Sequence, residues 1–188
     1  MPGVQDEMPK NKRPQEREAK RGEIVASARA LFMERGFEAT PMSAIARSAG
    51  VTPNTIYWYF SDKDDLLITV LDELLVESWA AYRGQTASDD VDQLVWVVDG
   101  FRDLHLLISE IHARVEVSPA LAAWHDRFHA ASEGLLADEL TARGVPEASL
   151  GPTVKIAVFV IEGLVTHGLE PAQARTILET LVAGMPSA

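Results

Sequence analysis

The pattern of apolar positions along this chain predicts helices from residue 16 to near its end. Between residues 16 and 35, apolar side chains recur at helical spacing on one stripe: Ile24, Ala28, Leu31 and Phe32. Gly36 then follows a basic last turn, which is typical of the end of a helix. Similar spacing returns in the later segments, and no useful stretch alternates with the period of a strand. We therefore predict an all-α fold of about nine helices.

Two short helices are expected over residues 43–49 and 53–60, joined by a three-residue turn. In that turn Gly50 supplies the left-handed backbone that ends the first helix. Thr52 and the proline after it have the pattern of an N-cap followed by proline in the first turn. Two short helices joined in this way form a helix-turn-helix.

The rest of the chain is predicted to form longer helices. Ser61 and Asp64 have the spacing of a capping box, which indicates that a helix begins after Ser61. Further helices are expected over residues 66–82, 91–105, 106–117 and 119–143, with Pro152 and Pro171 each opening one more. The predicted organisation has three parts: a disordered basic arm, residues 1–15; a helix-turn-helix domain, residues 16–62; and a helical domain, residues 63–188.

Composition is ordinary for a globular protein, with 188 residues of which 47% are hydrophobic and 24% charged. The absence of cysteine excludes disulfides, thiolate zinc sites and cysteine nucleophiles. No segment has the pattern of a signal peptide, and no apolar run approaches the ~20 residues of a membrane span. We therefore expect a cytoplasmic protein with no membrane partner.

Charge is distributed unevenly, although the net charge of −11 argues at first sight against a polyanionic partner. Residues 10–60 hold nine basic and five acidic side chains, whereas residues 61–188 hold eight basic and 21 acidic ones. A molecule whose front approaches a phosphate backbone has this distribution, and so does an acidic protein with a solvated basic tail. The basic segment Lys10–Arg21 is interpreted as making non-specific contacts to phosphates at most.

The stretch from Gly36 to Leu67, GFEATPMSAIARSAGVTPNTIYWYFSDKDDLL, resembles the N-terminal DNA-binding region of the TetR family of transcriptional regulators. The matching positions occur in order and without gaps: Gly36, Thr40, Ile45, Ala46, Ala49, Gly50, Val51, Thr55, Tyr57, Phe60, Lys63 and Leu66. The resemblance implies a three-helix DNA-binding bundle followed by a helical ligand-binding and dimerisation domain. It also implies a regulator, more often a repressor, that binds a palindromic operator as a homodimer and is released by a small-molecule effector.

The DNA-contacting face is expected on the helix over residues 53–60, where Ile56 and Phe60 point inward and leave uncharged polar and aromatic groups outside. Such groups reach base edges and phosphate oxygens. Position on this helix predicts that Thr52, Asn54 and Thr55 reach deepest into a major groove. The resemblance implies contacts from Ser43, Thr55, Tyr57, Tyr59 and Lys63.

Two residues on this helix have open roles. Asn54 stands where many family members have glycine, so it either reads an adenine or is only an exposed residue at a helix start. Trp58 either contacts DNA or packs against the neighbouring helix. A rival function remains, a helical ligand-binding or protein-interaction module that no longer binds DNA, but such a protein has no reason to keep this outer face polar and aromatic.

A homodimer is expected, because one short recognition helix buries too little surface for useful specificity. The helix from Pro152 is apolar over more than half of its circumference, which predicts burial on two sides. The expected interface residues lie on the last two helices: Val154, Ala157, Val158, Ile161, Leu164, Val165, Ile177, Leu178, Leu181 and Val182. The alternative is that both helices fill the core of a monomer.

A small-molecule pocket in the helical domain is implied by the resemblance. The candidate lining residues are aromatic or imidazole groups: Trp79, Trp96, Phe101, His105, His112, Trp124, Phe128 and Phe159. The same residue types at helical spacing also fill cores.

Neither a metal, a cofactor nor catalysis is predicted. His125 and His129 have a spacing that can chelate a metal, but the sequence shows no third ligand near them. No Ser-His-Asp order, phosphate loop or paired-carboxylate signature is present, so nothing indicates an enzyme.

Overall fold

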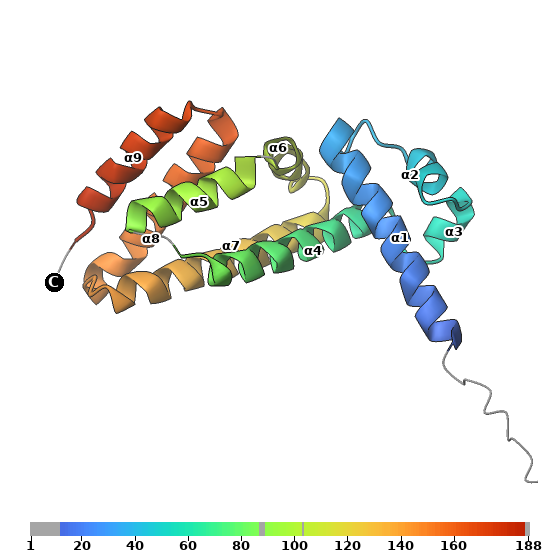
Figure 1. Ribbon diagram of the computed structural model, residues 1–188, viewed down its shortest axis with the longest axis horizontal. Helices are drawn as coiled ribbons and strands as arrows, with labels where there is room; N and C mark the ends of the chain where they lie inside the picture. The colour runs from blue at the N-terminus through green and yellow to red at the C-terminus, as the bar shows by residue number, and fades with distance from the viewer. Residues whose placement is uncertain (1–11, 87–88, 103, 187–188) are drawn as a thin grey trace, which may run out of the picture.

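The computed structural model describes residues 12–86, 89–102 and 104–186, and these residues form nine α-helices and no strand (Figure 1). The helices are α1 Lys12–Arg35, α2 Met42–Ser48, α3 Pro53–Tyr57, α4 Lys63–Gly84, α5 Asp90–Arg102, α6 His105–Arg114, α7 Pro119–Ala142, α8 Glu147–His167 and α9 Pro171–Ala183. The predicted all-α fold is therefore confirmed. We call α1–α3 the head and α4–α9 the body.

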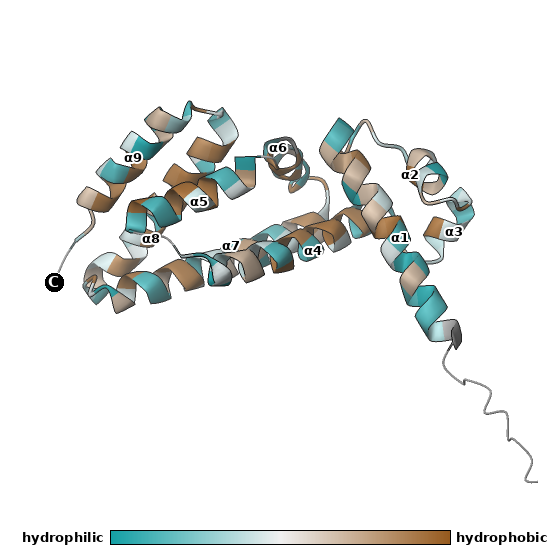
Figure 2. Cartoon of the chain, in the orientation of Figure 1, coloured by the Kyte–Doolittle hydropathy of each residue, from teal (hydrophilic) through white to brown (hydrophobic). Residues whose placement is uncertain are grey.

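The head lies at one end of an elongated molecule (Figure 1). Helices α4 and α7 run side by side away from it, and α5, α8 and α9 pack together at the far end, while α6 lies over the junction with the head. The N-terminal part of α1 extends beyond α2 and α3 and is mostly hydrophilic (Figure 2).

The head is built on the predicted apolar stripe of α1. Ile24, Ala28 and Phe32 are completely buried and pack in one cluster with Ile45 of α2 and Ile56 of α3. Both turns are closed by glycines with left-handed backbone, Gly36 at φ 81° and Gly50 at φ 64°. The helix-turn-helix predicted from the sequence is therefore present, with Thr52 as the N-cap of α3.

One hydrophobic core continues from the head into the body. The buried residues of α4, which include Leu66, Leu67 and Val70, belong to the same cluster as those of α1. Leu107 of α6 and Leu121 of α7 also belong to it. The predicted boundary between residues 62 and 63 thus coincides with the start of a helix that both parts share.

A second, smaller cluster lies at the far end of the body. Val98 of α5, Leu164 of α8 and Leu178 of α9 form its buried centre. This cluster holds α8 and α9 against α5 within a single chain.

Some helix ends differ from the prediction, such as that of the helix expected over residues 53–60, which ends at Tyr57, and three further details are wrong. Helix α1 begins at Lys12, so residues 12–15 are helical rather than part of a disordered arm; residues 1–11 lie outside the described residues. The cap of α4 is shifted by one residue: the Asp62 carboxylate accepts the Asp65 N–H at 2.8 Å, and the Asp65 carboxylate accepts the Ser61 N–H at 2.8 Å.

The third error concerns α8, which begins at Glu147 and contains Pro152 instead of starting there. A proline in the second turn removes a single helical hydrogen bond, which the remaining turns of a long helix tolerate. Among the described residues α8 is also the one helix long and apolar enough to cross a membrane, contrary to the sequence-based expectation. In the structure it packs against α5, α6, α7 and α9.

Candidate nucleic-acid interface and ligand cavity

Helix α3 presents an aromatic and polar face to solvent. Ile56 is fully buried beneath it, whereas Tyr57 is 54% exposed and Trp58 is 82% exposed. The indole of Trp58 therefore does not pack against a neighbouring helix, and that alternative is wrong. Asn54 is exposed on the same face. Large aromatic groups left in water beside amide and hydroxyl groups are typical of a contact surface.

The remaining predicted contact residues surround α3. The hydroxyl groups of Thr52 and Thr55 are hydrogen-bonded to each other at 2.9 Å. The Thr52 hydroxyl also accepts the Thr55 N–H at 3.3 Å, and this cap fixes the start of the helix. Ser43 is exposed on α2, and Tyr59 is half-buried after α3. Helix α2, which carries Ser43, packs directly against α3.

Basic side chains of α1 lie beside this surface. The Arg17 guanidinium carbon lies 5.9 Å from the centroid of the Tyr59 ring, and that of Arg21 lies 5.2 Å from the centroid of the Phe60 ring. Part of the basic segment Lys10–Arg21 thus lies on α1, against the two rings that follow α3. Lys63 is placed differently, because its ammonium nitrogen lies 4.0 Å from the centroid of the Phe37 ring and burial lowers its pKa.

Helix α6 is tied to the head by charged groups. The Glu110 carboxylate accepts the backbone N–H groups of Phe37 and of Glu38. Arg114 donates to Glu38 at 2.7 Å and to Asp64 at 2.8 Å. Burial opposes the charge on Arg114, but its hydrogen bonds to these carboxylates dominate and raise its pKa. These residues connect α6 to the turn after α1 and to the start of α4.

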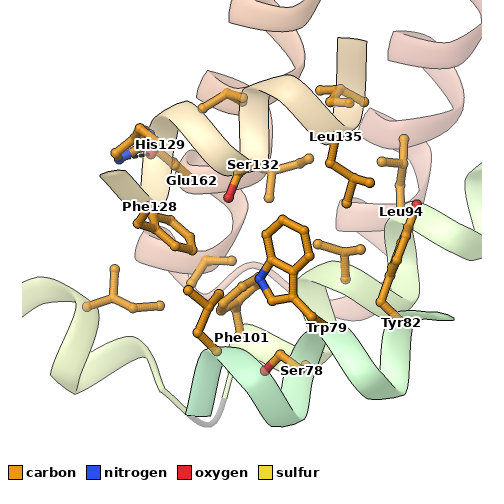
Figure 3. Close-up of a pocket in the computed structure, with 18 of the residues that line it drawn as sticks. Ser78, Trp79, Tyr82, Leu94, Phe101, Phe128, His129, Ser132, Leu135 and Glu162 are labelled. Carbon is orange, nitrogen blue, oxygen red and sulfur yellow. Dashed lines mark ion pairs between the residues drawn. The ribbon is translucent and has the colours of Figure 1, made fainter. Parts of the chain in front are cut away.

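A cavity of about 280 Å³ lies in the body, between α4, α5, α6, α7 and α8. Most of its lining is apolar, and the Trp79 indole stands among the lining residues (Figure 3). Six of the eight predicted ligand residues line it: Trp79, Trp96, Phe101, His112, Trp124 and Phe128. Volume and lining both fit a small apolar molecule.

Two of the predicted ligand residues lie elsewhere. His105 is exposed at the start of α6, with its Nδ1 2.8 Å from the carbonyl oxygen of Arg102. Phe159 is 68% exposed on α8 and does not line the cavity. Both predictions are wrong because helical spacing alone does not say which face of a helix meets the cavity.

Polar groups gather at one end of the cavity. The Tyr82 hydroxyl donates to Glu139 at 3.0 Å and accepts from the Gln93 side chain. Arg143 contacts Gln93 at 3.0 Å and Asp90 at 2.7 Å. Burial and the neighbouring Glu139 raise the pKa of Tyr82, so its hydroxyl keeps its proton.

Aromatic groups pack together in another part of the cavity wall. Trp124 stacks on Phe128, with ring centroids 5.5 Å apart, and its indole N–H donates to Asp72 of α4 at 2.8 Å. Histidines lie nearby, and burial lowers the pKa of His125, as do the neighbouring His129 and His112. At neutral pH the His125 imidazole is therefore uncharged.

The predicted dimer stripe is largely internal. Val154, Ala157, Leu164, Val165 and Leu178 are buried inside this chain, which corrects their assignment to an interface. Val158 and Ile161 line the cavity, while Leu181 and Val182 are half-buried. The exposed apolar side chains of these helices are instead Ile156 and Phe159 of α8 together with Ile177 of α9.

Sequence reasoning missed the residues whose role depends on packing between helices. Glu110, Arg114, Tyr82, Glu139 and Glu162 belong to no local motif. The sequence shows only that Glu110 and Arg114 are charged residues close to an apolar helix face. That pattern is common on solvated helices.

The head and body together define a helix-turn-helix protein with a cavity between the helices of its body. Residues 24–70 match the model of the bacterial regulatory proteins of the tetR family. The HTH-type transcriptional regulator TtgR of Pseudomonas putida is 35% identical over 80 residues, which cover 43% of this chain and 38% of that protein. The regulator TcmR of Streptomyces glaucescens is 28% identical over 89% of this chain and 80% of its own length.

Among solved structures, a transcriptional regulator from Rhodococcus sp. Rha1 superposes with a TM-score of 0.74 at 17% identity, over 88% of this chain and 95% of that one. At that identity the likeness concerns the fold. Residues 24–70 of the present chain are thus similar to the TetR family, and the whole chain has the all-helical fold of TetR-family regulators.

Replacing Arg114 by alanine is expected to destabilise the junction between α6 and the head. The change leaves Asp64 and Glu38 without their cation, and hydrogen bonds to charged groups contribute about 1.5–3 kcal/mol. Chemical denaturation should show that the free energy of unfolding falls by this amount. Arg127→Ala is the matched control, because Arg127 is exposed and contacts only its own helix. Equal stability of the two variants would contradict the assigned role.

Proposed function

We propose that this chain is a transcriptional repressor that binds a palindromic DNA operator as a homodimer and is released by a small-molecule effector. The observation that carries the proposal is the outer face of α3, where the exposed Tyr57 and Trp58 stand over the buried Ile56. A cytoplasmic place of action follows from this function.

DNA recognition is assigned to α3 and its surroundings. The Asn54 amide can make paired hydrogen bonds with an adenine, and the rings of Tyr57 and Trp58 offer apolar contact to thymine methyl groups. The hydroxyl groups of Ser43, Thr52, Thr55 and Tyr59 are suited to phosphate oxygens. The Lys63 ammonium is assigned the same role, which requires it to turn away from the Phe37 ring. The exposed Arg47 of α2 adds positive charge beside them.

The dimer interface is assigned to the exposed side of α8. Ile156 is 55% exposed and Phe159 is 68% exposed, and they lie three residues apart on neighbouring turns. A twofold axis places the same face of each chain against its copy, so one such stripe covers itself. Ile177 of α9 is a further apolar side chain left partly in water, at 37% exposure. Burial of these side chains between two copies provides apolar area for the dimer interface. Val154 and Leu178 cannot provide it, because they are already buried inside the chain.

The effector is assigned to the cavity. Its lining favours an apolar or aromatic molecule, with Tyr82 and Gln93 placed to bind one polar group. Helices α4 and α6 both line the cavity and both contact the head. A ligand that shifts them changes the distance between the two α3 helices, and a hundredfold loss of DNA affinity needs ~2.8 kcal/mol of coupling.

The rival function, a ligand-binding or interaction module without DNA binding, explains the cavity but leaves the α3 face without a use. The exposed phenol of Tyr57 at the end of α3 and the exposed indole of the C-cap residue Trp58 favour the DNA-binding proposal, as do Arg17 and Arg21 against the two rings that follow.

A mobility-shift assay on an operator selected from random DNA tests the α3 assignment. The double variant Thr55→Ala with Tyr57→Ala is expected to lose binding at least a hundredfold, because it removes a hydroxyl and a phenol from the contact face. Circular dichroism should show unchanged helicity. Val117→Ala, at an exposed position of the body, is the control and should bind as the wild type does. Equal binding by the double variant would reject the assignment.

Analytical ultracentrifugation tests the α8 face. Phe159→Glu is expected to convert a dimer into a monomer at micromolar concentration, because it places two carboxylates against each other across the twofold axis. Val117→Glu adds the same charge to another exposed apolar position and should leave the dimer intact. A Phe159→Glu protein that stays dimeric places the interface elsewhere.

A further inference from the structure

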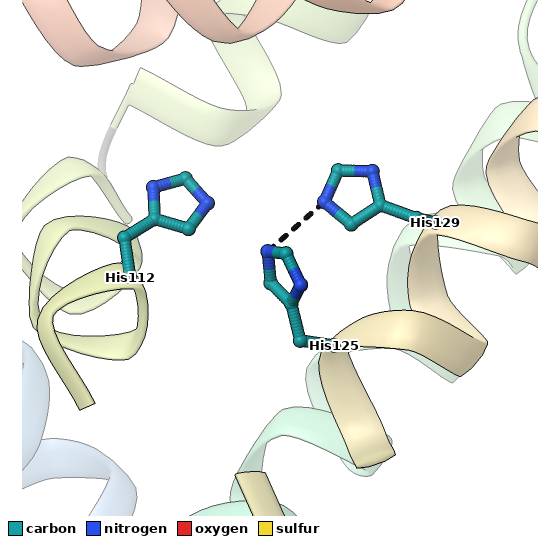
Figure 4. Close-up of side chains that lie close together, drawn as sticks. All are labelled: His112, His125 and His129. Atoms are coloured by element: carbon teal, nitrogen blue, oxygen red, sulfur yellow. Dashed lines mark hydrogen bonds between the residues drawn. The ribbon is translucent and has the colours of Figure 1, made fainter. Parts of the chain in front are cut away.

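Three histidines from two helices meet at the wall of the cavity (Figure 4). His112 lies on α6, and His125 and His129 lie one turn apart on α7. One ring nitrogen of each lies within 4.8 Å of the corresponding atoms of the other two. Glu162 of α8 joins this group, with a carboxylate oxygen 3.2 Å from Nε2 of His129.

One atom of this cluster, Nε2 of His129, has two close polar neighbours. Nε2 of His129 lies 3.0 Å from Nε2 of His125 and 3.2 Å from the Glu162 carboxylate. A neutral imidazole nitrogen carries either one proton or one lone pair. With a proton it serves only one of its two neighbours well, and with a lone pair it faces the lone pairs of the carboxylate. A metal cation placed between the groups accepts lone pairs from all of them at once.

The donor set is that of a transition-metal site. Three imidazoles and one carboxylate match the ligands that Zn²⁺ takes in proteins, and imidazole also suits Cu²⁺ and Ni²⁺. Two ligand atoms bound to one tetrahedral zinc ion at about 2.0–2.1 Å lie about 3.3–3.4 Å apart. The pairs at 3.0 Å and 3.2 Å are already near this separation. His112, the exposed member, needs only a side-chain adjustment to close the site.

Neighbouring side chains hold the rings in place. His112 and His125 meet edge to face with centroids 5.2 Å apart, and Phe128 packs its edge against His129 at 5.4 Å. Glu162 and the two α7 histidines are all partly buried. The four candidate ligands thus lie on three helices at the wall of an apolar cavity.

We propose that His112, His125, His129 and Glu162 bind one divalent transition-metal ion, with Zn²⁺ as the expected occupant. The ion links α6, α7 and α8 at the cavity wall. The sequence pattern gave reason to expect no metal, because the third histidine is 13 residues away from His125 on another helix.

Occupancy of this site has a route to the head. His112 lies on α6 between Glu110 and Arg114, the two residues that tie this helix to the turn after α1 and to α4. An ion that fixes α6 against α7 and α8 therefore restrains the head. This consequence for DNA affinity, unlike the metal site itself, rests on the proposed function.

Calorimetric titration with Zn²⁺ tests the site, using the full chain without a polyhistidine tag and after removal of metal by a chelator. One ion per chain is expected, together with the visible absorption of tetrahedral Co²⁺ when Co²⁺ is used instead. His112→Ala should weaken Zn²⁺ binding at least tenfold and His125→Ala at least a hundredfold. His105→Ala, an exposed histidine seven residues away on α6, is the matched control and should bind as the wild type does.

Circular dichroism of the metal-free variants distinguishes loss of a ligand from loss of the fold. Absence of stoichiometric binding to the folded wild type, or equal weakening by His105→Ala and His112→Ala, overturns the metal site. The operator mobility shift, measured with and without Zn²⁺, is a separate readout: a change of threefold or more that His112→Ala removes supports the route to the head. Zn²⁺ binding without any such change overturns that route alone, and normal DNA binding by a chain that takes no Zn²⁺ leaves the proposed function standing.

Discussion

The orientation of the head depends on the core that continues through α4. Leu66, Leu67 and Val70 pack against α1 on one side and share their cluster with α6 and α7. Because protein interiors are close-packed, the head cannot turn on the body without displacing these side chains. The direction in which α3 presents Tyr57 and Trp58 is therefore set by the same contacts that build the body.

A second connection to the head is ionic and lies on α6. Glu110 and Arg114 hold the turn after α1 and the start of α4 through hydrogen bonds at the partly exposed junction. Such bonds are directional and rearrange at lower cost than a packed core. A hundredfold change in DNA affinity corresponds to ~2.8 kcal/mol, which is of the size of one or two charged hydrogen bonds. The α6 junction is thus a suitable place for a signal from the cavity to act.

Both helices that connect the head to the body, α4 and α6, also line the cavity. Trp124 bonds to Asp72 of α4, so the aromatic side of the cavity is joined directly to the helix that carries the head. His112 of α6 contacts His125 of α7 beside these aromatic groups. The proposed effector and the proposed metal ion would accordingly act on neighbouring, not identical, connections.

Local signals made the head predictable from the sequence. Gly36, Gly50 and Thr52 mark the ends of helices by backbone conformation and capping, which depend on few residues. The inward position of Ile56 follows from helical periodicity, so the outer face of α3 was predicted with it.

The body was less predictable, because its sites depend on how separate helices pack. Periodicity showed that the helix carrying Val154 is buried on more than one side, but it does not distinguish burial by the same chain from burial by a partner. In the structure Val154 and Leu178 face their own core and Phe159 faces solvent. Pairing of His112 with His125 likewise depends on the contact between α6 and α7, which no local pattern encodes.

Hydroxyl-radical footprinting of the wild-type protein on a selected operator tests the central claim most directly, since it records where and on which side the duplex is covered. Two copies of an outward α3 predict two protected patches on one face of the DNA, with centres about 34–36 Å apart or a multiple of that distance. A single patch, or protection spread evenly around the duplex, would contradict the claim that paired α3 helices hold the DNA.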